Sequence, residues 1–472
     1  MTLSVVAAAR DAGSRVALCV GARDVTYAEL AALAGRRMAW LAERGVPRGA
    51  ARPVALVGRS DLSSLALLHA LVEQGTPAAL VHPRFTERER ARVVALLDSA
   101  LVVAESPTDA DTPDAPPPAL GLAVDPERAL AILFTSGTTG EPKGVVLSRR
   151  AFVASAAASH ENLPLGPGDR WLLGLPIAHV GGLSVLTRSL VARSTVVVPA
   201  EVAAGERLRP EALRECLERE GVTLASLVPT QLEWLLDAGF SPPPSLRVVL
   251  LGGAAARPAL LARAAERGVP VLTTYGLTEA CSQVTTERFG APRRADGAVG
   301  WPLRGTEVRI TEGAIEVRGP TLLTGYLTSA GLVSPLGPDG FFRTDDLGRL
   351  DAEGRLHVLG RRSDLLVTGG ENVYPAEVEA VLERAAGVRS ACIFGVPDEL
   401  FGDRVVAALV VGDPAGFDLG AFARFVVTEL APHRRPRAVA LVASLAVTGA
   451  GKLDRKATAA LAAPLLVPLG ST

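Results

Sequence analysis

Strand-like and helix-like segments alternate along the first half of the chain, and this alternation constrains the fold most strongly. A capping box at 26–29 opens an amphipathic helix predicted over 30–44. Apolar runs separated by helical patterns are typical of strands joined by crossover helices, so we expect an α/β fold with a largely parallel sheet. The predicted units are a strand at 53–57, a helix at 62–74, a strand at 78–81, and strand–helix pairs at 222–238 and 247–267.

The pattern changes after about residue 305. Short alternating runs separated by glycines predict a small antiparallel, β-barrel-like subdomain, and a helix followed by two strands predicts a smaller α+β domain. We place the boundary at the charged segment 360–364, which gives a large N-terminal domain over 1–360 and a C-terminal domain over 361–472. The short runs are 308–310, 314–318 and 355–359, and the α+β segments are 375–385, 391–396 and 405–411.

Composition and charge argue against several classes of function. The net charge of −1 supplies no overall basic field for nucleic acid. Apolar runs such as 62–72 and 191–198 are too short to span a bilayer, and residues 1–10 lack the pattern of a signal peptide. The four cysteines are scattered singly, without metal-ligand spacing. We therefore expect a cytoplasmic protein that binds neither membrane nor nucleic acid.

Lysine is rare in this chain, and its positions are informative. Only three of the 49 Lys and Arg residues are lysines. Lys143 lies in the loop Thr135-Ser-Gly-Thr-Thr-Gly-Glu-Pro-Lys-Gly144, and Lys452 lies in Thr448-Gly-Ala-Gly-Lys-Leu-Asp454. A lysine ammonium is a compact charge on a flexible stem, whereas arginine is a rigid planar fork. The pattern indicates two sites that each need an ammonium group.

The first of these loops has the composition of a phosphate-binding loop. It follows an apolar run at 129–134, and its glycines and hydroxyls let backbone N–H groups converge on an anion. Lys143 is followed by Gly144 and another apolar run, so the loop is not the GxxxxGK[ST] motif of kinases and GTPases. A flexible hairpin is the structural alternative, but the full string is more specific than a bare glycine-rich loop.

At these residues the chain resembles the acyl-adenylate-forming superfamily, which includes acyl- and aryl-CoA ligases, adenylation domains of peptide synthetases and luciferases. The resemblance covers nearly the full length, with further motifs in register at 275–279, 342–346, 360–364 and 369–375 and at Lys452. Within the superfamily, the segments 175–184, 226–232, 250–254 and 275–283 are most similar to o-succinylbenzoate–CoA ligases of menaquinone synthesis.

The resemblance implies an enzyme that uses ATP, Mg²⁺ and coenzyme A to activate a small carboxylic acid in two steps. The carboxylate first attacks ATP to give acyl-AMP and pyrophosphate, and the CoA thiolate then displaces AMP. A carboxylate is already deprotonated at pH 7, so the first step needs positive charge and alignment rather than a general base. The resemblance also implies a mobile C-terminal domain that carries the catalytic lysine.

Site residues follow from the resemblance. Lys452 would bridge the carboxylate and the α-phosphate, Glu279 would bind Mg²⁺, and Thr278 would face the α-phosphate or the carboxylate. His179 lies where the family has a gate to the acyl pocket; a structural histidine is the alternative. The nucleotide and CoA residues are Thr135, Ser136, Gly137, Thr138, Thr139, Gly140, Lys143, Gly253, Tyr275, Gly276, Asp346, Arg361, Gly369 and Gly370. The acyl-pocket residues are His179, Gly252, Gly253, Ala254, Ser282 and Gln283.

The chain departs from the family pattern at three positions. Asp345 replaces a glycine next to Asp346, which the resemblance implies is the ribose-binding carboxylate, with Asp345 as the alternative. Ser363 replaces the usual charged residue of the hinge, with Asp364 next to it, and Gly181 stands where the o-succinylbenzoate group has serine. The second carboxylate of that substrate needs a positive or hydroxyl-rich contact. Candidates for this contact are Arg188, Thr230, Gln231, Ser282 and Gln283.

Alternative functions stay open on the sequence. The acid is most readily o-succinylbenzoate, but a benzoate- or anthranilate-type acid is an alternative, as is an adenylation enzyme that loads a carrier protein. A catalytically silent nucleotide-binding protein is disfavoured because Lys143, Glu279, Asp346 and Lys452 are all present. A homodimer is neither indicated nor excluded.

Overall fold

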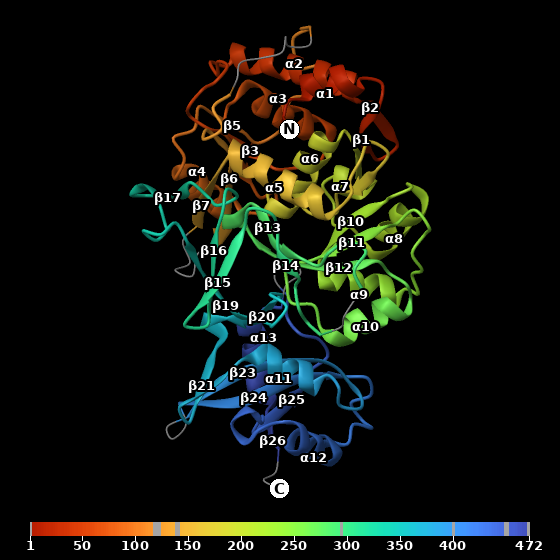
Figure 1. Ribbon diagram of the computed structural model, residues 1–472, viewed down its shortest axis with the longest axis vertical. Helices are drawn as coiled ribbons and strands as arrows, with labels where there is room; N and C mark the ends of the chain where they lie inside the picture. The colour runs from red at the N-terminus through yellow and green to blue at the C-terminus, as the bar shows by residue number, and fades with distance from the viewer. Residues whose placement is uncertain are drawn as a thin grey trace.

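The molecule has a large upper part and a smaller lower part joined at a narrow waist (Figure 1). The computed structural model describes residues 2–116, 124–136, 142–292, 296–398, 402–447 and 453–469. The N-terminal three quarters of the chain form the upper part, and the C-terminal segment, blue in Figure 1, forms the lower part. The predicted α/β class, with a large N-terminal and a smaller C-terminal domain, is confirmed.

A nine-stranded sheet forms one wall of the upper part. Its six central strands run parallel, and antiparallel strands close both edges. Leucines of three helices, α8 (Pro210–Arg219), α9 (Pro229–Asp237) and α10 (Pro258–Glu266), pack on one face in a core of their own. In sheet order the strands are β14 (Trp301–Pro302), β13 (Ser282–Thr286), β12 (Val271–Leu277), β11 (Val248–Leu251), β10 (Leu224–Leu227), β8 (Arg170–Leu172), β9 (Thr195–Val198), β1 (Val16–Val20) and β2 (Arg23–Thr26).

A seven-stranded sheet forms the second wall. It shares the main hydrophobic core with the first sheet and with the helices that lie between and beside them. These helices are α1 (Val5–Ala12), α2 (Tyr27–Glu43), α3 (Leu62–Gln74), α5 (Arg149–Asn162) and α6 (Val180–Ala192). Two further helices of the upper part are α4 (Glu87–Ala95) and α7 (Ala200–Ala203). In sheet order the strands are β18 (Gly331–Val333), β17 (Gly325–Thr328), β7 (Pro142–Ser148), β6 (Ala129–Ser136), β4 (Ala78–Val81), β3 (Val54–Val57) and β5 (Leu101–Val103).

The remaining strands form two smaller sheets. A four-stranded antiparallel sheet corresponds to the predicted β-barrel-like unit and contains β15 (Glu307–Thr311), β16 (Ala314–Arg318), β19 (Phe342–Leu350) and β20 (Leu356–Arg361). The C-terminal sheet contains β21 (Leu366–Thr368), β22 (Glu371–Val373), β23 (Val388–Asp398), β24 (Gly402–Val411), β25 (Ala438–Leu441) and β26 (Val467–Pro468), with helices α11 (Pro375–Leu382), α12 (Leu419–Glu429) and α13 (Arg455–Ala462).

Both faces of the C-terminal sheet are buried. Alternate residues of β23 point to opposite faces, as a strand requires. Ile393 packs into a core with α11 and α12, whereas Phe394 packs into a second core that includes Ala462 of α13. The chain passes from β20 to β21 through the 3₁₀ turn η2 (Arg362–Asp364). The domain boundary at 360/361 stays a prediction, and it lies directly before this turn.

A specific contact joins the upper and lower parts. Arg257, which precedes α10, donates from Nη1 to Glu383 Oε1 (3.1 Å) and to the carbonyl oxygen of Arg389 (3.0 Å). Its Nη2 donates to Glu233 in the upper part (2.6 Å). Glu383 is 4% exposed in its side chain, and its burial raises its pKa. The two parts are therefore tied by a half-buried ion pair in this arrangement.

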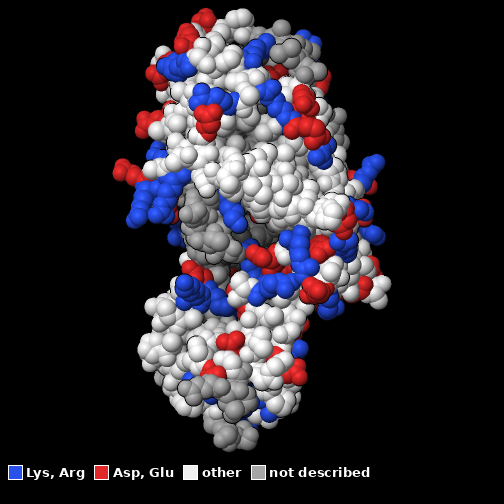
Figure 2. All heavy atoms as spheres, turned by 90° about the vertical axis from the view of Figure 1, so that its left-hand side faces the viewer, with Lys and Arg blue, Asp and Glu red and all other residues white. Residues whose placement is uncertain are grey.

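Charge is interspersed on the surface. Figure 2 shows basic and acidic side chains mixed over one face and around the waist. Ion pairs such as Arg309–Glu316 and Arg343–Glu312 lie on the four-stranded sheet. Within the described ranges, no helix is long and apolar enough to cross a membrane.

Candidate functional site

Three residues predicted to hold the nucleotide come together from three strands. Tyr275 on β12 donates its hydroxyl hydrogen to Asp346 Oδ2 on β19 (2.7 Å), and Arg361 Nε at the end of β20 lies 3.4 Å from Asp346 Oδ1. Asp346 and Arg361 are partners in the register of β19 and β20. Burial, followed by the Asp346 charge, raises the pKa of Tyr275 well above its usual range. The carboxylate is thus held from both sides.

Asp345 and Asp346 point in different directions. As neighbours on β19 they alternate between faces. Asp346 meets Tyr275 and Arg361, whereas Asp345 is exposed and its charge acts on Tyr326, whose pKa it helps to raise. The geometry therefore favours Asp346 over Asp345 as the group that faces a bound nucleotide.

A second cluster gathers Lys143, Glu279 and Tyr326. The Tyr326 hydroxyl donates to Glu279 Oε1 (2.9 Å), and Lys143 Nζ lies 5.5 Å from the Tyr326 ring centroid. Tyr326 arrives on β17, which pairs with β7 so that Tyr326 lies opposite Val145. Burial first, and then Glu279, raise the pKa of Tyr326. The predicted metal ligand and the predicted phosphate lysine are thus neighbours, and the tyrosine between them was not predicted.

The turn after β12 is tightly built and strained. A Cβ added at Gly276 would lie 1.9 Å from the Ser282 carbonyl oxygen. The backbone of β13 therefore leaves room only for glycine at position 276. Thr278 and Glu279 occupy the 3₁₀ turn η1 (Thr278–Ala280). Cys281 (φ 52°) and Ser282 (φ 93°) then follow in the positive-φ region, where non-glycine residues are uncommon. Strain of this kind persists only where surrounding structure enforces it, and it often marks a functional turn.

The predicted acyl side contains a histidine pair. His179 is exposed at the N-terminal end of α6, and its ring centroid lies 5.0 Å from that of His82, which follows β4. The burial of His82 and the charge of Arg84 lower the His82 pKa. Gln283 is buried and donates to Thr286 Oγ1 (2.8 Å), so its amide is engaged within the sheet. Gly252, Gly253 (φ 78°) and Ala254 follow β11 at the same edge of the sheet as the turn after β12.

Arg188 is a buried cation behind the strained turn. It is 2% exposed; its Nη2 donates to Ser155 Oγ (3.3 Å), and Ser155 donates to the Cys281 carbonyl oxygen (2.8 Å). Its guanidinium carbon lies 5.9 Å from the Trp171 ring centroid. Among the described residues no carboxylate pairs with it, and Nε has no hydrogen-bond partner there. Burial lowers the Arg188 pKa to about 10.

Several predicted residues are only partly accounted for. Thr135 is paired with Lys143 in the register of β6 and β7, and Ser136 ends β6. Gly369 (φ 59°) and Gly370 (φ 82°) form the two-residue turn between β21 and β22, which requires positive φ at both positions and explains these glycines without a ligand. Gly137, Thr138, Thr139, Gly140 and Lys452 lie outside the described residues.

The site fits Mg²⁺ better than a metal held by the protein alone. In the described part of the chain, no three His, Cys, Asp or Glu side chains gather as a metal cage. Glu279 uses Oε1 to accept from Tyr326, and no side chain of the described residues hydrogen-bonds to its second oxygen, which leaves that oxygen for a metal. Mg²⁺ in nucleotide enzymes is held by one or two carboxylates together with substrate phosphates and waters. The donor set is therefore compatible with a magnesium–nucleotide complex.

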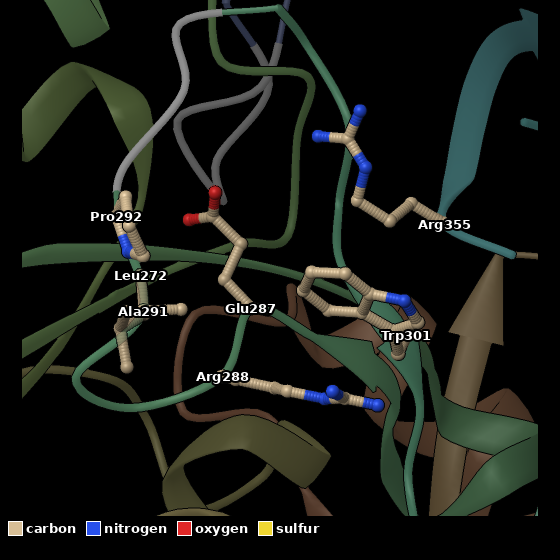
Figure 3. A pocket seen from close by; sticks show the side chains of 7 residues that line it. All are labelled: Leu272, Glu287, Arg288, Ala291, Pro292, Trp301 and Arg355. Atoms are coloured by element: carbon tan, nitrogen blue, oxygen red, sulfur yellow. The ribbon is translucent and has the colours of Figure 1, made fainter. Parts of the chain in front are cut away.

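A small cavity of about 70 Å³ lies apart from these residues (Figure 3). Trp301 is stacked between Arg288, 4.6 Å from its ring centroid, and Arg355, at 6.0 Å. A cavity of this size holds a few waters and cannot hold a nucleotide. None of the predicted site residues lines it: its walls are Leu272, Glu287, Arg288, Ala291, Pro292, Trp301 and Arg355.

Comparison with known proteins gives a consistent answer. The 2-succinylbenzoate–CoA ligase of Listeria monocytogenes serotype 4b (strain F2365) is 36% identical over 416 residues, which cover 85% of this chain and 87% of that protein. The o-succinylbenzoate CoA synthetase of Bacillus subtilis with its acyl-adenylate intermediate is 30% identical with a TM-score of 0.82, covering 96% of each chain. The same enzyme with ATP and magnesium ion has a TM-score of 0.82 at 30% identity, covering 96% of this chain and 98% of that one.

The family match extends over both parts of the molecule. Residues 5–327 match the AMP-binding enzyme family, and residues 377–452 match the AMP-binding enzyme C-terminal domain. The first match includes the turn after β12 and the cluster of Lys143, Glu279 and Tyr326, and the second ends at Lys452. The chain belongs to the AMP-binding enzyme family.

Proposed function

We propose that the chain is an ATP-dependent ligase that converts 2-succinylbenzoate and coenzyme A to the CoA thioester through an acyl-AMP. The relatives that carry this activity in their names match most of the chain, at identities from 32% to 36%. The observation within the structure that carries the proposal is Arg188, a buried cation with no carboxylate partner among the described residues. A substrate with a second carboxylate can supply that partner.

The nucleotide would be held at two clusters. Asp346, fixed by Tyr275 and Arg361, would accept hydrogen bonds from the ribose hydroxyls, because a carboxylate is an acceptor only. Lys143 would bind the β- and γ-phosphates together with hydroxyls and amides of the loop from Thr135 to Gly140. Glu279 would bind Mg²⁺, which when present neutralises phosphate charge.

The first step would join the acid to the nucleotide. A carboxylate oxygen attacks the α-phosphorus, the bond to the β-phosphate oxygen breaks, and pyrophosphate leaves. Lys452 would place an ammonium between the two anionic groups, and Thr278 would hydrogen-bond to one of them. Loss of a preorganised donor of this kind costs on the order of 3–4 kcal/mol of barrier. Lys452→Ala should therefore slow adenylation by on the order of several hundred-fold.

The second step would transfer the acyl group to sulfur. The thiolate of CoA attacks the acyl carbon, the bond to the AMP oxygen breaks, and AMP leaves. We propose that the C-terminal domain turns about the segment 361–364 between the steps, which removes Lys452 from the site. Lys452→Ala should then still convert presynthesised acyl-AMP and CoA to thioester, and equal loss of both steps would contradict the domain rotation.

The acyl group would lie on the side of His179 and the turn after β12. His179 and His82 would form its outer wall, and Arg188 would attract the distal carboxylate from behind Cys281 and Ser282. Among the five predicted candidates for this contact, Arg188 is the one charged side chain, and Gln283 is engaged with Thr286. A benzoate- or anthranilate-type acid would leave Arg188 without an anion, so we rank these substrates second.

The deciding experiment is pyrophosphate release across a panel of acids. 2-Succinylbenzoate, benzoate, anthranilate and malonate are each supplied with ATP, Mg²⁺ and CoA. We expect the highest kcat/KM for 2-succinylbenzoate. Turnover of benzoate but not of 2-succinylbenzoate would refute the substrate, and no release with any acid would refute the ligase. The four cysteines are free and buried, which supports our placement of the enzyme in a reducing cytoplasm.

A further inference from the structure

A partly buried ion pair lies next to the segment that carries Lys452. Arg455 begins α13, three residues after Lys452 in the sequence, and its side chain is 18% exposed. Its guanidinium forms an ion pair with Glu379 on α11, and Nη1 also donates to the Ile393 carbonyl oxygen (2.6 Å). Arg455 therefore joins α13 to both α11 and β23.

Glu379 is itself fixed. Its Oε1 accepts from the backbone N–H of Ile393 (2.7 Å), so Glu379 and Arg455 bind the two backbone polar groups of one residue. Burial alone would lower the pKa of Arg455, but Glu379, with smaller contributions from Cys392 and Asp364, raises it above its usual value. The charge of Arg455 is thus paired with a carboxylate within the C-terminal domain, unlike that of Arg188.

The ends of the segment from 448 to 452 are held at this same place. Val447 and Leu453 form an antiparallel bridge, and Asp454 N–H donates to the Ala446 carbonyl oxygen (2.8 Å). Ala446 N–H donates in turn to Thr458 Oγ1 on α13 (3.0 Å). Both ends of the segment are therefore attached to the first turn of α13, and that turn is placed by Arg455.

Arg455 also reaches the segment between the two domains. Its Nε lies 3.5 Å from Asp364 Oδ2, in the turn η2 that connects β20 to the C-terminal sheet. Asp364 lies next to Ser363 in the predicted hinge. The same guanidinium thus contacts the crossing between domains and fixes the helix that follows Lys452.

We propose that Arg455, paired with Glu379, is a positioning residue that sets where Lys452 is delivered for adenylation. The inference rests on the role proposed above for Lys452. A buried ion pair is weak evidence for stability, because well-packed apolar side chains are often as stable, and fixing one arrangement is its better-attested use. Arg455 does not touch the substrates itself; it fixes the base of the segment whose lysine does.

Three variants separate positioning from folding. Arg455→Met removes the cation, and Glu379→Gln combined with Arg455→Met removes both charges, so that no unpaired carboxylate remains buried. The matched control is Arg435→Ala, because Arg435 caps α12 in the same domain by donating to the carbonyl oxygens of Leu430 (2.8 Å) and Val427 (2.9 Å). Thermal midpoints of all variants are recorded first, and rates are compared for folded protein.

The two half-reactions are then measured separately. Adenylation is followed as pyrophosphate release without CoA, and thioester formation as AMP release from presynthesised acyl-AMP and CoA. We expect both Arg455 variants to lose on the order of 100-fold in adenylation, as small misplacements of a reacting group do, while thioester formation changes little. Arg435→Ala should affect neither step. Folded Arg455 variants with normal adenylation, or equal loss of both steps, would overturn the proposal.

A second readout depends on no acyl substrate. Because the chain has three lysines, acylation by an amine reagent can be followed at each by mass spectrometry. With ATP and Mg²⁺ we expect protection of Lys143 and Lys452 in the wild type, and loss of protection at Lys452 alone in Arg455→Met. Equal protection at Lys452 in both proteins would refute positioning. Absence of protection at Lys452 in the wild type would refute its proposed role first, and the inference with it.

Discussion

Replacement of Arg188 by methionine should separate diacid from monoacid substrates. Methionine fills a similar volume without charge, so the space behind Cys281 stays packed. The guanidinium is 2% exposed, and no carboxylate of the described chain neutralises it. If the distal carboxylate of 2-succinylbenzoate is its partner, Arg188→Met removes a charge-assisted hydrogen bond. Benzoate has no distal carboxylate and loses nothing.

The expected magnitude follows from that one contact. A hydrogen bond to a charged group contributes about 1.5–3 kcal/mol, and about 1.4 kcal/mol is a factor of ten. Arg188→Met should therefore lower kcat/KM for 2-succinylbenzoate by about 10- to 150-fold. The free energy of unfolding should not decrease in this variant, because burial of the unpaired Arg188 charge destabilises the free enzyme. We expect the thermal midpoint of the variant not to fall.

Pyrophosphate release with each acid, together with a thermal melt, tests this reasoning. Arg149→Met is the control, since Arg149 is a partly buried arginine that donates to the carbonyl oxygen of Val72 (2.9 Å). Its loss should cost stability and change the two acids alike. Equal losses for both acids in Arg188→Met, with a lower thermal midpoint, would show that Arg188 is a structural arginine.

Three further predictions use other contacts. Tyr326→Phe frees Glu279 from its hydrogen bond and should raise the Mg²⁺ concentration for half-maximal pyrophosphate release about tenfold. Arg257→Ala leaves Glu383 buried without its partner, at a cost of about 3 kcal/mol, and should change the solution X-ray scattering as the lower part detaches. Burial lowers the pKa of His69 from 6.5 to about 4, so the unfolded chain binds the proton more readily and stability falls as pH drops through 6.5. The loss should be about 2 kcal/mol between pH 7 and 5, by urea unfolding, and absent in His69→Leu.

Each of these has a control and a contrary result. Tyr27→Phe is the control, because the Tyr27 hydroxyl donates to backbone carbonyl oxygens, and it should leave the Mg²⁺ requirement unchanged. An unchanged requirement in Tyr326→Phe as well would show that Tyr326 does not act on the metal site. Arg263→Ala is the control for Arg257→Ala, because it breaks the exposed ion pair between Arg263 on α10 and Asp237. Identical scattering from the two variants would contradict the interdomain role of Arg257. Parallel losses of stability in wild type and His69→Leu would exclude this histidine as the cause.

Local elements with clear termini were predictable from the sequence. The helix over 62–74 and the strand over 78–81 match α3 and β4, because Asp61 caps the helix and Gly75 (φ 74°) ends it. Helix α6 was missed, since it opens with two glycines that disfavour helix. The second of them, Gly182, is required by packing: an added Cβ would lie 2.3 Å from the Pro176 carbonyl oxygen.

Motif residues were predictable, and their partners were not. The resemblance supplied Tyr275, Asp346 and Arg361, and the structure brings these three together. Tyr326 carries no motif and reaches Glu279 only through the pairing of β17 with β7, strands about 180 residues apart in sequence. Arg455 likewise depends on how α13 meets α11. Long-range pairing of this kind leaves no local sequence pattern.

Arg455 and Arg188 argue for function by opposite criteria. Arg455 has its charge paired with Glu379 and donates from Nη1 to the Ile393 carbonyl oxygen, so its removal should destabilise the C-terminal domain and disturb one chemical step. Arg188 donates to Ser155 Oγ but has no carboxylate partner among the described residues, and a buried unpaired charge lowers the stability of the folded protein. Replacement of Arg455 should therefore lower stability, whereas replacement of Arg188 should not. This difference would distinguish a cation that stabilises the fold from one whose partner is a bound anion.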